Sequence, residues 1–254
     1  MIYIGIPVHN ERHTIGPLLW RIREILYGER REFHVIVCDD ASDDGTAEAL
    51  ARYPRVLPLT LLRIDARVGT AACLERLVRE AVRRSGYPRR DALVTMQADF
   101  SDPPECISEM LRRFEGGADV VTVTPPGVLP RSQRYARLGG RLLGPKLAAA
   151  GIEADPYGSQ RLYRLFTLLR ASDDLAPGSP LLQHRGWAAN AELLLKVWPH
   201  VRRIEEVDAL APGVRRYRDS RFEALAQIGA LFRAGRDPVL KAALKRARAD
   251  ATTA

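Results

Sequence analysis

Short apolar runs alternate with helix-like segments along the first half of this chain. The runs predict buried strands at residues 2–6, 33–38, 57–64, 92–97 and 120–124. Between them, apolar residues recur at intervals of three and four, the spacing of one helix face, which predicts helices at residues 14–28, 46–52, 71–82 and 104–115. Strands that alternate with helices predict an α/β fold with a mainly parallel central sheet and helices on both faces.

The second half of the chain has a weaker pattern, because prolines and glycines interrupt it after residue 124. We expect a basic helical segment at 135–149, an apolar segment at 162–169, a helix at 188–198, a strand at 204–207, and an amphipathic helix over 220–248 that breaks near Asp237-Pro238. Too few strands remain for a second sheet. We therefore expect a single domain over residues 1–222, followed by a C-terminal amphipathic helix and tail at 223–254.

The charge of the chain narrows the range of partners. The 254 residues carry a net charge of +8, and arginine supplies most of it, since lysine occurs only four times. Arginine binds phosphate through a bidentate fork, so an anionic ligand is one explanation and a solvated basic surface is the other. The arginines are spread over most predicted helices without a nucleic-acid-binding motif, which argues against a nucleic-acid partner.

The cysteines and the apolar runs bear on cellular location. Cys38, Cys73 and Cys106 are far apart in the sequence, which indicates neither a zinc site nor a redox pair and fits a reducing compartment. Neither a signal peptide nor a run of about 18 apolar residues is evident. We therefore expect a cytoplasmic protein whose membrane contact, if it has one, is peripheral and at the inner membrane face.

Carboxylates follow two of the predicted strands at the point where each strand ends. Asp39 and Asp40 come directly after the run at 33–38, and Asp99 follows the run at 92–97. The carboxyl ends of parallel strands form the ligand-binding edge of open α/β sheets, so these side chains mark a candidate site. Asp99 suits a hard divalent cation such as Mg²⁺ or Mn²⁺, which prefers oxygen ligands and bridging phosphates.

Other polar residues of these turns have structural explanations. Ser42 and Asp44 are typical of residues that cap a helix, here the one predicted from Thr46. Asp102 precedes two prolines and is expected to cap the helix that they begin. The turn at residues 7–11 lacks the glycine-rich dinucleotide fingerprint, and it offers either ligand-binding polar groups or a plain helix N-terminus.

Together, these turns resemble glycosyltransferase family 2, and within it the polyprenol-phosphate (dolichol-phosphate) mannosyltransferase branch, which implies the nucleotide-diphospho-sugar transferase fold called GT-A. The segments that carry the resemblance are Pro7-Val8-His9-Asn10-Glu11, Asp39-Asp40-Ala41-Ser42-Asp43-Asp44-Gly45-Thr46, Arg67-Val68-Gly69-Thr70-Ala71, Gln97-Ala98-Asp99-Phe100-Ser101-Asp102-Pro103-Pro104-Glu105 and Asp155-Pro156-Tyr157-Gly158-Ser159-Gln160-Arg161-Leu162-Tyr163-Arg164. The second segment matches the family's D-D-x-S-x-D-G-T. The fourth resembles its D-A-D-x-x-x-P-P-E, with glutamine in the first position.

The resemblance implies a donor site for a nucleoside-diphosphate sugar of the GDP-mannose or UDP-glucose type. It assigns the nucleotide to Pro7, His9, Glu11, Val37, Asp39 and Asp40. It assigns the diphosphate and a Mg²⁺ or Mn²⁺ cofactor to Gln97, Ala98, Asp99 and Ser101, with Asp99 as the metal ligand. It assigns further phosphate contacts to Arg164, Arg215 and Arg221.

The implied reaction is the inverting transfer of a hexose. The acceptor attacks the anomeric carbon while the cation at Asp99 neutralises the leaving diphosphate. A lipid-phosphate acceptor such as a polyprenyl phosphate needs no general base, because a phosphate monoester with a second pKa of ~6 is already largely ionised at neutral pH. A small hydroxyl acceptor needs a base, for which the resemblance points to Glu192, and an exposed helix glutamate is the alternative for that residue.

Two features leave alternatives open. Gln97 replaces the first carboxylate of the family's D-x-D, so the chain is either a metal-dependent transferase or a catalytically silent protein that binds a nucleotide sugar or a partner protein. The stretch from Arg131 to Lys146 alternates basic and apolar residues. It is either a contact for an anionic membrane surface or a core-packed helix with an arginine-rich face.

Overall fold

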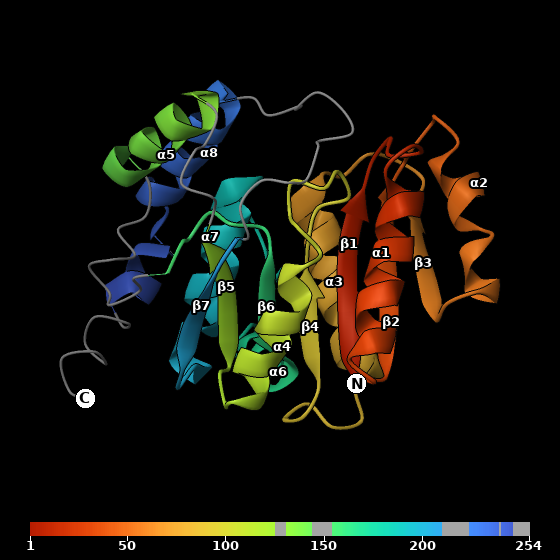
Figure 1. Ribbon diagram of the computed structural model, residues 1–254. Coiled ribbons are helices and arrows are strands. Elements are labelled where there is room, and N and C mark those ends of the chain that lie inside the picture. The colour runs from red at the N-terminus through yellow and green to blue at the C-terminus, as the bar shows by residue number, and fades with distance from the viewer. Residues whose placement is uncertain (125–130, 144–153, 210–223, 239, 246–254) are drawn as a thin grey trace.

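The computed structural model describes residues 1–124, 131–143, 154–209, 224–238 and 240–245. Within them, a seven-stranded sheet has the order β3-β2-β1-β4-β6-β5-β7 (Figure 1). Its strands are β1 (Ile2–Val8), β2 (Phe33–Asp40), β3 (Leu59–Ile64), β4 (Ala92–Thr95), β5 (Val120–Thr124), β6 (Arg161–Arg164) and β7 (Ile204–Asp208). Every strand pair is parallel except those made by β6, which runs antiparallel to β4 and β5. The predicted mainly parallel sheet is confirmed.

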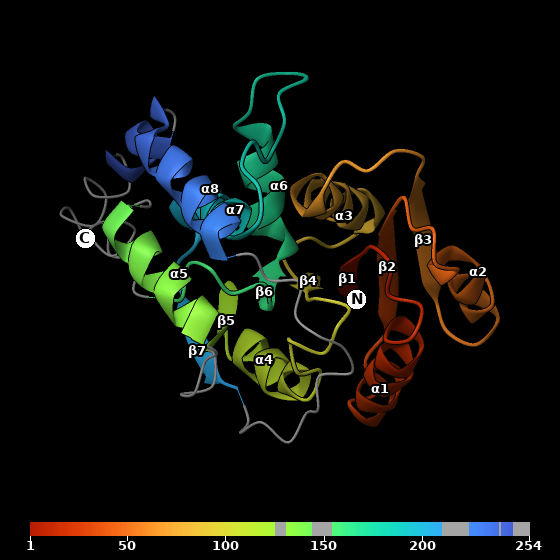
Figure 2. The ribbon, with the colours of Figure 1, turned by 90° about the horizontal axis from the view of Figure 1, so that it is seen from above.

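Helices cover both faces of the sheet, as predicted (Figure 2). They are α1 (Ile15–Gly28), α2 (Thr46–Leu50), α3 (Thr70–Arg84), α4 (Cys106–Glu115), α5 (Arg131–Leu143), α6 (Leu165–Asp173), α7 (Trp187–Val197) and α8 (Ala224–Arg236), with short 3-10 helices at Tyr53–Arg55 and Trp198–His200. One apolar core joins α1 and α4 to one face, and the other joins α3, α6, α7 and α8 to the opposite face. Because a strand is pleated, its successive side chains point to opposite faces of the sheet and so enter the two cores in turn.

The predicted strands agree with the structure better than their predicted ends do. β5 has the predicted bounds, whereas β2 continues beyond the predicted run and includes Asp39 and Asp40, because its pairing with β3 continues to that point. The apolar segment predicted at 162–169 is divided between β6 and α6. The predicted break near Asp237 is confirmed, since α8 ends at Arg236.

The second half of the chain adds β6 and β7 to the same sheet. The expected boundary between residues 222 and 223 lies outside the described residues. In the part of the chain that is described, no helix is long and apolar enough to cross a bilayer.

Two glycines let α5 lie close against α8. A Cβ atom at Gly140 would lie 2.8 Å from Leu231 Cδ1 and 2.9 Å from the hydroxyl oxygen of Tyr157. A Cβ atom at Gly139 would lie 3.1 Å from Ile228 Cγ1. These positions therefore have a packing role that the sequence pattern does not reveal.

The strand register aligns the two acidic turns on either side of β1. β1 lies between β2 and β4, with Val8 opposite Asp39 and Gly5 opposite Thr95. Because both pairings are parallel, the residues that follow the three strands leave the sheet at its carboxyl edge. Asp39 and the turn that contains Asp99 therefore share one edge, which is the arrangement on which the predicted site depends.

Candidate functional site

Asp39 is the second-to-last residue of β2, and its side chain is fully buried. Its Oδ1 accepts two hydrogen bonds from Ser42, one from the backbone N–H at 3.1 Å and one from the hydroxyl at 2.5 Å. Its Oδ2 is shielded from solvent and has no hydrogen-bond partner among the described residues. A buried polar atom without a partner costs about 1–3 kcal/mol, so a ligand N–H at this position would be favourable.

Asp40, the next residue, serves the loop on the other face of the sheet. Its Oδ1 accepts the N–H of Val68 at 2.7 Å, and its Oδ2 accepts the N–H of Gly69 at 2.9 Å. Gly69 has a φ of +91° and immediately precedes α3, so Asp40 fixes the entry to that helix. Both carboxylate oxygens are engaged in this way, and the expected contact of Asp40 with the nucleotide stays a prediction.

The turn after β1 is bound to the turn after β2. Asn10 and Asp43 exchange two hydrogen bonds, of 2.7 and 3.0 Å. The backbone N–H of Asn10 also donates to the Ser42 hydroxyl at 2.9 Å. His9 Nδ1 lies 2.8 Å from the backbone carbonyl oxygen of Asp40. The predicted nucleotide residue His9 is therefore held at the carboxyl edge, next to Asp39.

Glu11 and Asp44 continue the same network. The buried Glu11 carboxylate accepts the hydroxyl of Thr14 at 2.6 Å, and the Glu11 backbone N–H donates to Thr46 Oγ1 at 2.9 Å. Asp44 Oδ1 accepts the backbone N–H of Thr46, the first residue of α2, at 2.9 Å. The N-cap position itself is Gly45, and Ser42, which was also expected to cap the helix, donates to Asp39 instead. The two turns thus form one hydrogen-bonded platform around Asp39.

Two further predicted nucleotide contacts, Pro7 and Val37, are residues of the strands themselves. Pro7 is half-buried near the end of β1. Val37 is fully buried in the apolar core shared with α1. Its side chain has no exposed surface for a ligand, because core residues are packed on all sides.

Asp102 fixes the turn that contains Gln97 and Asp99. Its Oδ2 accepts the backbone N–H of Gln97 at 2.8 Å and the hydroxyl of Ser159 at 2.7 Å. The expected role of Asp102 as a helix cap is wrong, because α4 begins only at Cys106 and the carboxylate instead joins the turn to the segment before β6. Burial raises the pKa of Asp102 to about 6, and the nearby charge of Asp99 acts in the same direction.

Asp99 stands at the sheet edge with a half-buried side chain. Its Oδ1 accepts the backbone N–H of Ser101 at 3.0 Å, across Phe100, whose φ is +60°. Among the described residues, no group of three or more His, Cys, Asp or Glu side chains is gathered as a metal site. One carboxylate nevertheless fits a hard cation that takes its other ligands from substrate phosphates and water.

Arg164 lies at the opposite end of the sheet from Asp99. β6 is antiparallel, so Arg164 pairs with Ala92, the first residue of β4. Its guanidinium forms an ion pair with Asp119 at 2.7 Å and donates to three backbone carbonyls. The structure therefore does not bring Arg164 to the edge that holds Asp39 and Asp99. The other two predicted phosphate contacts lie outside the described residues: Arg215 and Arg221.

Arg161, at the other end of β6, is the arginine on the side of the carboxyl edge. It pairs with Thr95, the last residue of β4. Its side chain is almost completely buried and donates to the carbonyl oxygens of Asp155 at 2.8 Å and Asn190 at 2.6 Å. Arg161 thus connects the segment before β6 to α7. The sequence analysis did not single it out, because the direction of β6 was not known.

Glu192 is buried in the middle of α7. Its Oε2 accepts the N–H groups of Gln183 and His184 and lies 3.0 Å from His184 Nδ1, while its Oε1 accepts from Lys196 Nζ at 2.8 Å. The alternative of an exposed helix glutamate is wrong, because Glu192 is only 2% exposed. The role of acceptor-activating base stays a prediction, for a carboxylate that neighbouring donors already engage. His184 Nε2 lies 3.4 Å from Asp237, so this cluster joins α7 to the end of α8.

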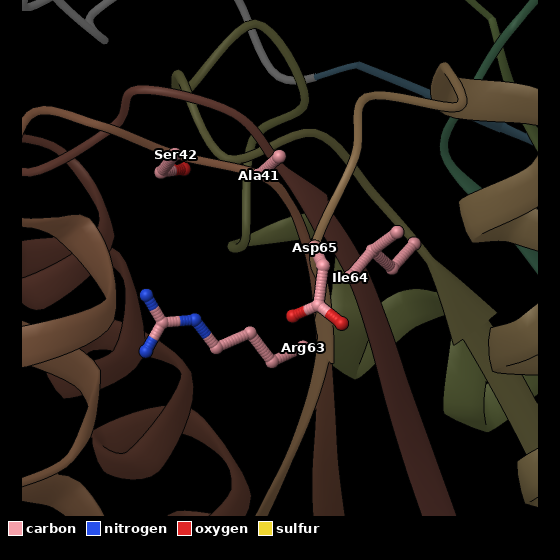
Figure 3. Close-up of a pocket in the computed structure, with 5 residues that line it drawn as sticks. All are labelled: Ala41, Ser42, Arg63, Ile64 and Asp65. Carbon is pink, nitrogen blue, oxygen red and sulfur yellow. The ribbon is translucent and has the colours of Figure 1, made fainter.

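A pocket of about 330 Å³ opens between the turn after β2 and the end of β3 (Figure 3). It is lined by Ala41, Ser42, Arg63, Ile64 and Asp65. The register places Arg63 opposite Asp39, so the two side chains leave the same face of the sheet. The sequence analysis missed Arg63 and Asp65, although a charged residue at a strand end is the same signal that identified Asp39.

Solved structures share this architecture. Glucosyl-3-phosphoglycerate synthase from Mycobacterium tuberculosis, crystallised with Mn²⁺, UDP-glucose and phosphoglyceric acid, matches with a TM-score of 0.64 over 98% of this chain and 80% of that chain, at 20% sequence identity. Another crystal structure of that enzyme matches with a TM-score of 0.63 over 95% of this chain and 80% of that chain, at 19% identity. At this level of identity the likeness establishes the fold, and the chain has the GT-A glycosyltransferase fold that the sequence predicts.

The chain belongs to glycosyl transferase family 2, whose family model matches residues 3–170. A dolichol-phosphate mannosyltransferase from Pyrococcus furiosus is 31% identical over 119 residues, which cover 47% of this chain and 31% of that protein. An undecaprenyl-phosphate 4-deoxy-4-formamido-L-arabinose transferase from Pseudomonas fluorescens is 27% identical over 124 residues, which cover 47% of this chain and 34% of that protein. The matched region thus spans about a third of the length of these relatives.

Proposed function

We propose that this protein is an inverting transferase that moves a hexose from a nucleoside diphosphate to a polyprenyl phosphate. The observation that carries the proposal is the position of Asp39 and Asp99 on one edge of the sheet, on either side of β1. Family membership supports glycosyl transfer. The lipid phosphates in the names of the two relatives support the acceptor, and the UDP-glucose and Mn²⁺ of the structural neighbour support the donor and a divalent cation.

The nucleobase is proposed to bind near Asp39 and the pocket that Arg63 lines. Ser42 already donates twice to Asp39 Oδ1, which leaves Oδ2 for the ligand. Uracil presents a single imino N–H between two carbonyls, whereas guanine presents adjacent imino and amino N–H groups that suit both oxygens of a carboxylate. We therefore favour a uridine diphosphate donor. Because Oδ2 is shielded, neighbouring side chains must shift when the base binds.

The diphosphate is proposed to lie over the turn at residues 97–99. When bound, a Mg²⁺ or Mn²⁺ ion at Asp99 would neutralise the charge that develops on the leaving diphosphate. Gln97 keeps an oxygen acceptor at the position of the missing carboxylate but brings no negative charge, so metal affinity should depend more strongly on the donor's own phosphates. Asp102 holds the Gln97 backbone and thereby keeps the turn in place.

The acceptor phosphate is proposed to react without a protein base. One of its oxygens forms a bond to the anomeric carbon while the bond from that carbon to the diphosphate oxygen breaks, so the configuration inverts and the nucleoside diphosphate leaves with the electron pair. Because the phosphate monoester is largely ionised at neutral pH, with a second pKa of ~6, no proton has to be removed. This agrees with the engagement of Glu192 by neighbouring donors.

Calorimetry with UDP-glucose and GDP-mannose tests the donor. We expect UDP-glucose to bind more tightly. We also expect a chelator to weaken its binding at least about tenfold, since a cation held by Asp99 would offset the negative charge of the diphosphate. Transfer is then followed with labelled donor and undecaprenyl phosphate. Failure of every nucleotide sugar to bind in the presence of Mn²⁺ would refute the proposal.

A catalytically silent nucleotide-sugar-binding protein is the second candidate, and the amide at Gln97 is the observation that favours it. The Gln97→Asp variant separates the two functions. For a transferase, the variant should lower the Mn²⁺ concentration needed for half-maximal transfer, because a second carboxylate strengthens the site. If the natural protein binds UDP-glucose but transfers nothing, and Gln97→Asp creates transfer, the silent protein is the correct description.

A further inference from the structure

One side of α5 is exposed and combines apolar with basic side chains. Tyr135 is 67% exposed and Leu138 is 56% exposed, and Arg131 and Arg134 are exposed beside them. Spacings of three and four residues put all four side chains on one stripe of the helix. On the neighbouring helix α8, Leu225 is 84% exposed. We give the name α5–α8 face to the exposed stripe of α5 together with the exposed Leu225 of α8, the helix that packs against α5.

The other side of α5 is used for internal packing. Arg137 forms a bidentate ion pair with Asp155, at 2.7 and 2.9 Å, and its guanidinium lies over the ring of Trp187 at 5.3 Å. Ala136 is fully buried, and Gly140 lies against α8. The exposed stripe is therefore separate from the surface that anchors the helix, so substitutions on it should leave the fold intact.

The charge around this face is entirely positive along both helices. The sequences of α5 and α8 contain six arginines and no acidic residue, in a chain that has 31 acidic residues elsewhere. Of the six, Arg137 is neutralised by Asp155. A basic surface of this kind attracts anions, and the attraction weakens as salt screens it.

We propose that the α5–α8 face docks the protein on the surface of an anionic lipid bilayer. Exposed tyrosine and leucine side chains suit the boundary between headgroups and acyl chains, and arginines suit the lipid phosphates, as in helices that lie in a membrane interface. The exposed aliphatic residues Leu138 and Leu225 argue against nucleic acid, which is bound through phosphate contacts and stacked aromatic rings.

The position of this face suits the proposed acceptor. α5 follows β5, whose carboxyl end lies on the same edge as Asp39 and Asp99, and α5 and α8 lie side by side beyond that edge (Figures 1 and 2). Docking through the α5–α8 face would bring the rim of the candidate site close to a bilayer that holds a lipid phosphate. The role of docking in sugar transfer rests on the proposed function. Binding to a bilayer can be measured by itself, without a sugar donor and without transfer.

Sedimentation with vesicles tests the inference on the full chain. The protein should bind vesicles that contain phosphatidylglycerol at least about tenfold more tightly than vesicles of phosphatidylcholine alone, because the basic face gains from negative surface charge. Raising the salt from about 0.1 M to about 1 M should weaken this binding. Equal binding to both vesicles, or binding to neither, would overturn the proposal.

Two double variants locate the surface. Tyr135→Ser with Leu138→Ser should weaken binding to phosphatidylglycerol vesicles about tenfold, and Arg131→Gln with Arg134→Gln should weaken it to a similar extent. The matched control is Trp20→Ser with Tyr27→Ser on α1, where the two rings are 52% and 54% exposed. The control should bind like the natural protein. An effect of the control equal to that of the α5 variants overturns the assignment to this face.

Other occupants of the face give distinct results. A dimer that the Tyr135→Ser, Leu138→Ser variant dissociates in light scattering would assign the face to a second copy of the chain. Binding to single-stranded RNA in preference to vesicles would assign it to nucleic acid. Either result overturns the lipid proposal. Calorimetry with UDP-glucose keeps the two proposals separate, since a natural protein that binds UDP-glucose but not phosphatidylglycerol vesicles rejects only docking. In the α5 variants, loss of vesicle binding with unchanged donor binding is the result that docking predicts.

Discussion

The turns after β2 and β4 lie at the same edge of the sheet, and each contains two carboxylates with different surroundings. After β2, Asp40 is engaged by two backbone N–H groups, whereas Asp39 keeps one oxygen without a partner among the described residues. After β4, Asp102 is buried and holds two segments together, whereas Asp99 is half-buried at the edge. In each turn, one carboxylate builds the loop, and the other is the one to which we assign a ligand contact.

The two turns direct their paired carboxylates to different places in different ways. Asp39 and Asp40 are adjacent, and the pleat of β2 sends them to opposite faces of the sheet. Asp99 and Asp102 are separated by a turn in which Phe100 has a φ of +60°. A carboxylate at a strand end is therefore not a ligand by position alone, because the donors around it decide whether it is already satisfied.

Among the variants of these two turns, removal of the proposed metal ligand should have the largest effect on activity. Asp99→Ala should lower kcat/KM for sugar transfer about a thousandfold, because it removes the protein's charged contact to the cation that stabilises the leaving group. The melting temperature should change little, since the side chain is half-buried. Transfer at the natural rate in this variant would remove Asp99 from the proposed machinery.

Asp102, the buried carboxylate of the same turn, should make the free energy of unfolding depend on pH. The folded pKa of Asp102 is about 6, above the ordinary 3.8, so folding favours its protonated form. Its stabilising contribution is complete below pH 3.8 and is lost as the pH rises through about 6, and the difference between the two pKa values corresponds to about 3 kcal/mol. Urea unfolding between about pH 4 and about pH 7 measures it.

Asp102→Asn is the matched control for that pH dependence. The amide keeps an acceptor oxygen for the Gln97 N–H and does not titrate, so this part of the fall in unfolding free energy with rising pH should disappear. An identical pH dependence in the natural protein and in Asp102→Asn would show that the titrating group lies elsewhere.

The two neighbours on β2 should respond differently to truncation. Asp40→Ala removes the acceptors of two backbone N–H groups and should lower the unfolding free energy by about 2 kcal/mol. Asp39→Ala removes an unpartnered oxygen along with the bonds from Ser42, so its net cost should be smaller. Equal losses of unfolding free energy in the two variants, measured by urea unfolding, would contradict the different roles proposed for Asp39 and Asp40.

The smallest expected effect is on the binding of the donor's nucleobase. Asp39→Asn keeps the size of the side chain and replaces an acceptor by an amide, so stability should change little. Donor affinity in calorimetry should fall about tenfold, the value of one hydrogen bond to a charged group. Unchanged affinity for UDP-glucose would remove Asp39 from the base-binding role.

Much of the candidate site follows from local patterns in the sequence. The apolar runs located β2 and β4, and with them the strand ends that carry Asp39 and Asp99. The contact of Asp44 with the first N–H of α2 also followed from residue type and spacing. Such features are predictable because they depend on residues only a few positions apart, through the pleat of a strand or the turn of a helix.

The surroundings of Arg164 and Glu192 could not be predicted, and for a different reason. Arg164 was assigned to a phosphate on a motif alone, but β6 pairs antiparallel to β4, so its last residue lies at the amino edge of the sheet and Arg161 lies at the other. Glu192 was assigned a catalytic role, but donors from residues 183, 184 and 196 engage it in the interior. Neither outcome can be obtained from the residues around each position.

The sequence by itself therefore determined the α/β class, the location of most strands and the two acidic turns, since period and capping are properties of short segments. Only the tertiary structure decided the direction of β6, the burial of Glu192 and the close approach of α5 to α8 at Gly139 and Gly140. These depend on which distant segments meet. That choice is made by the packing of the whole chain around its two cores.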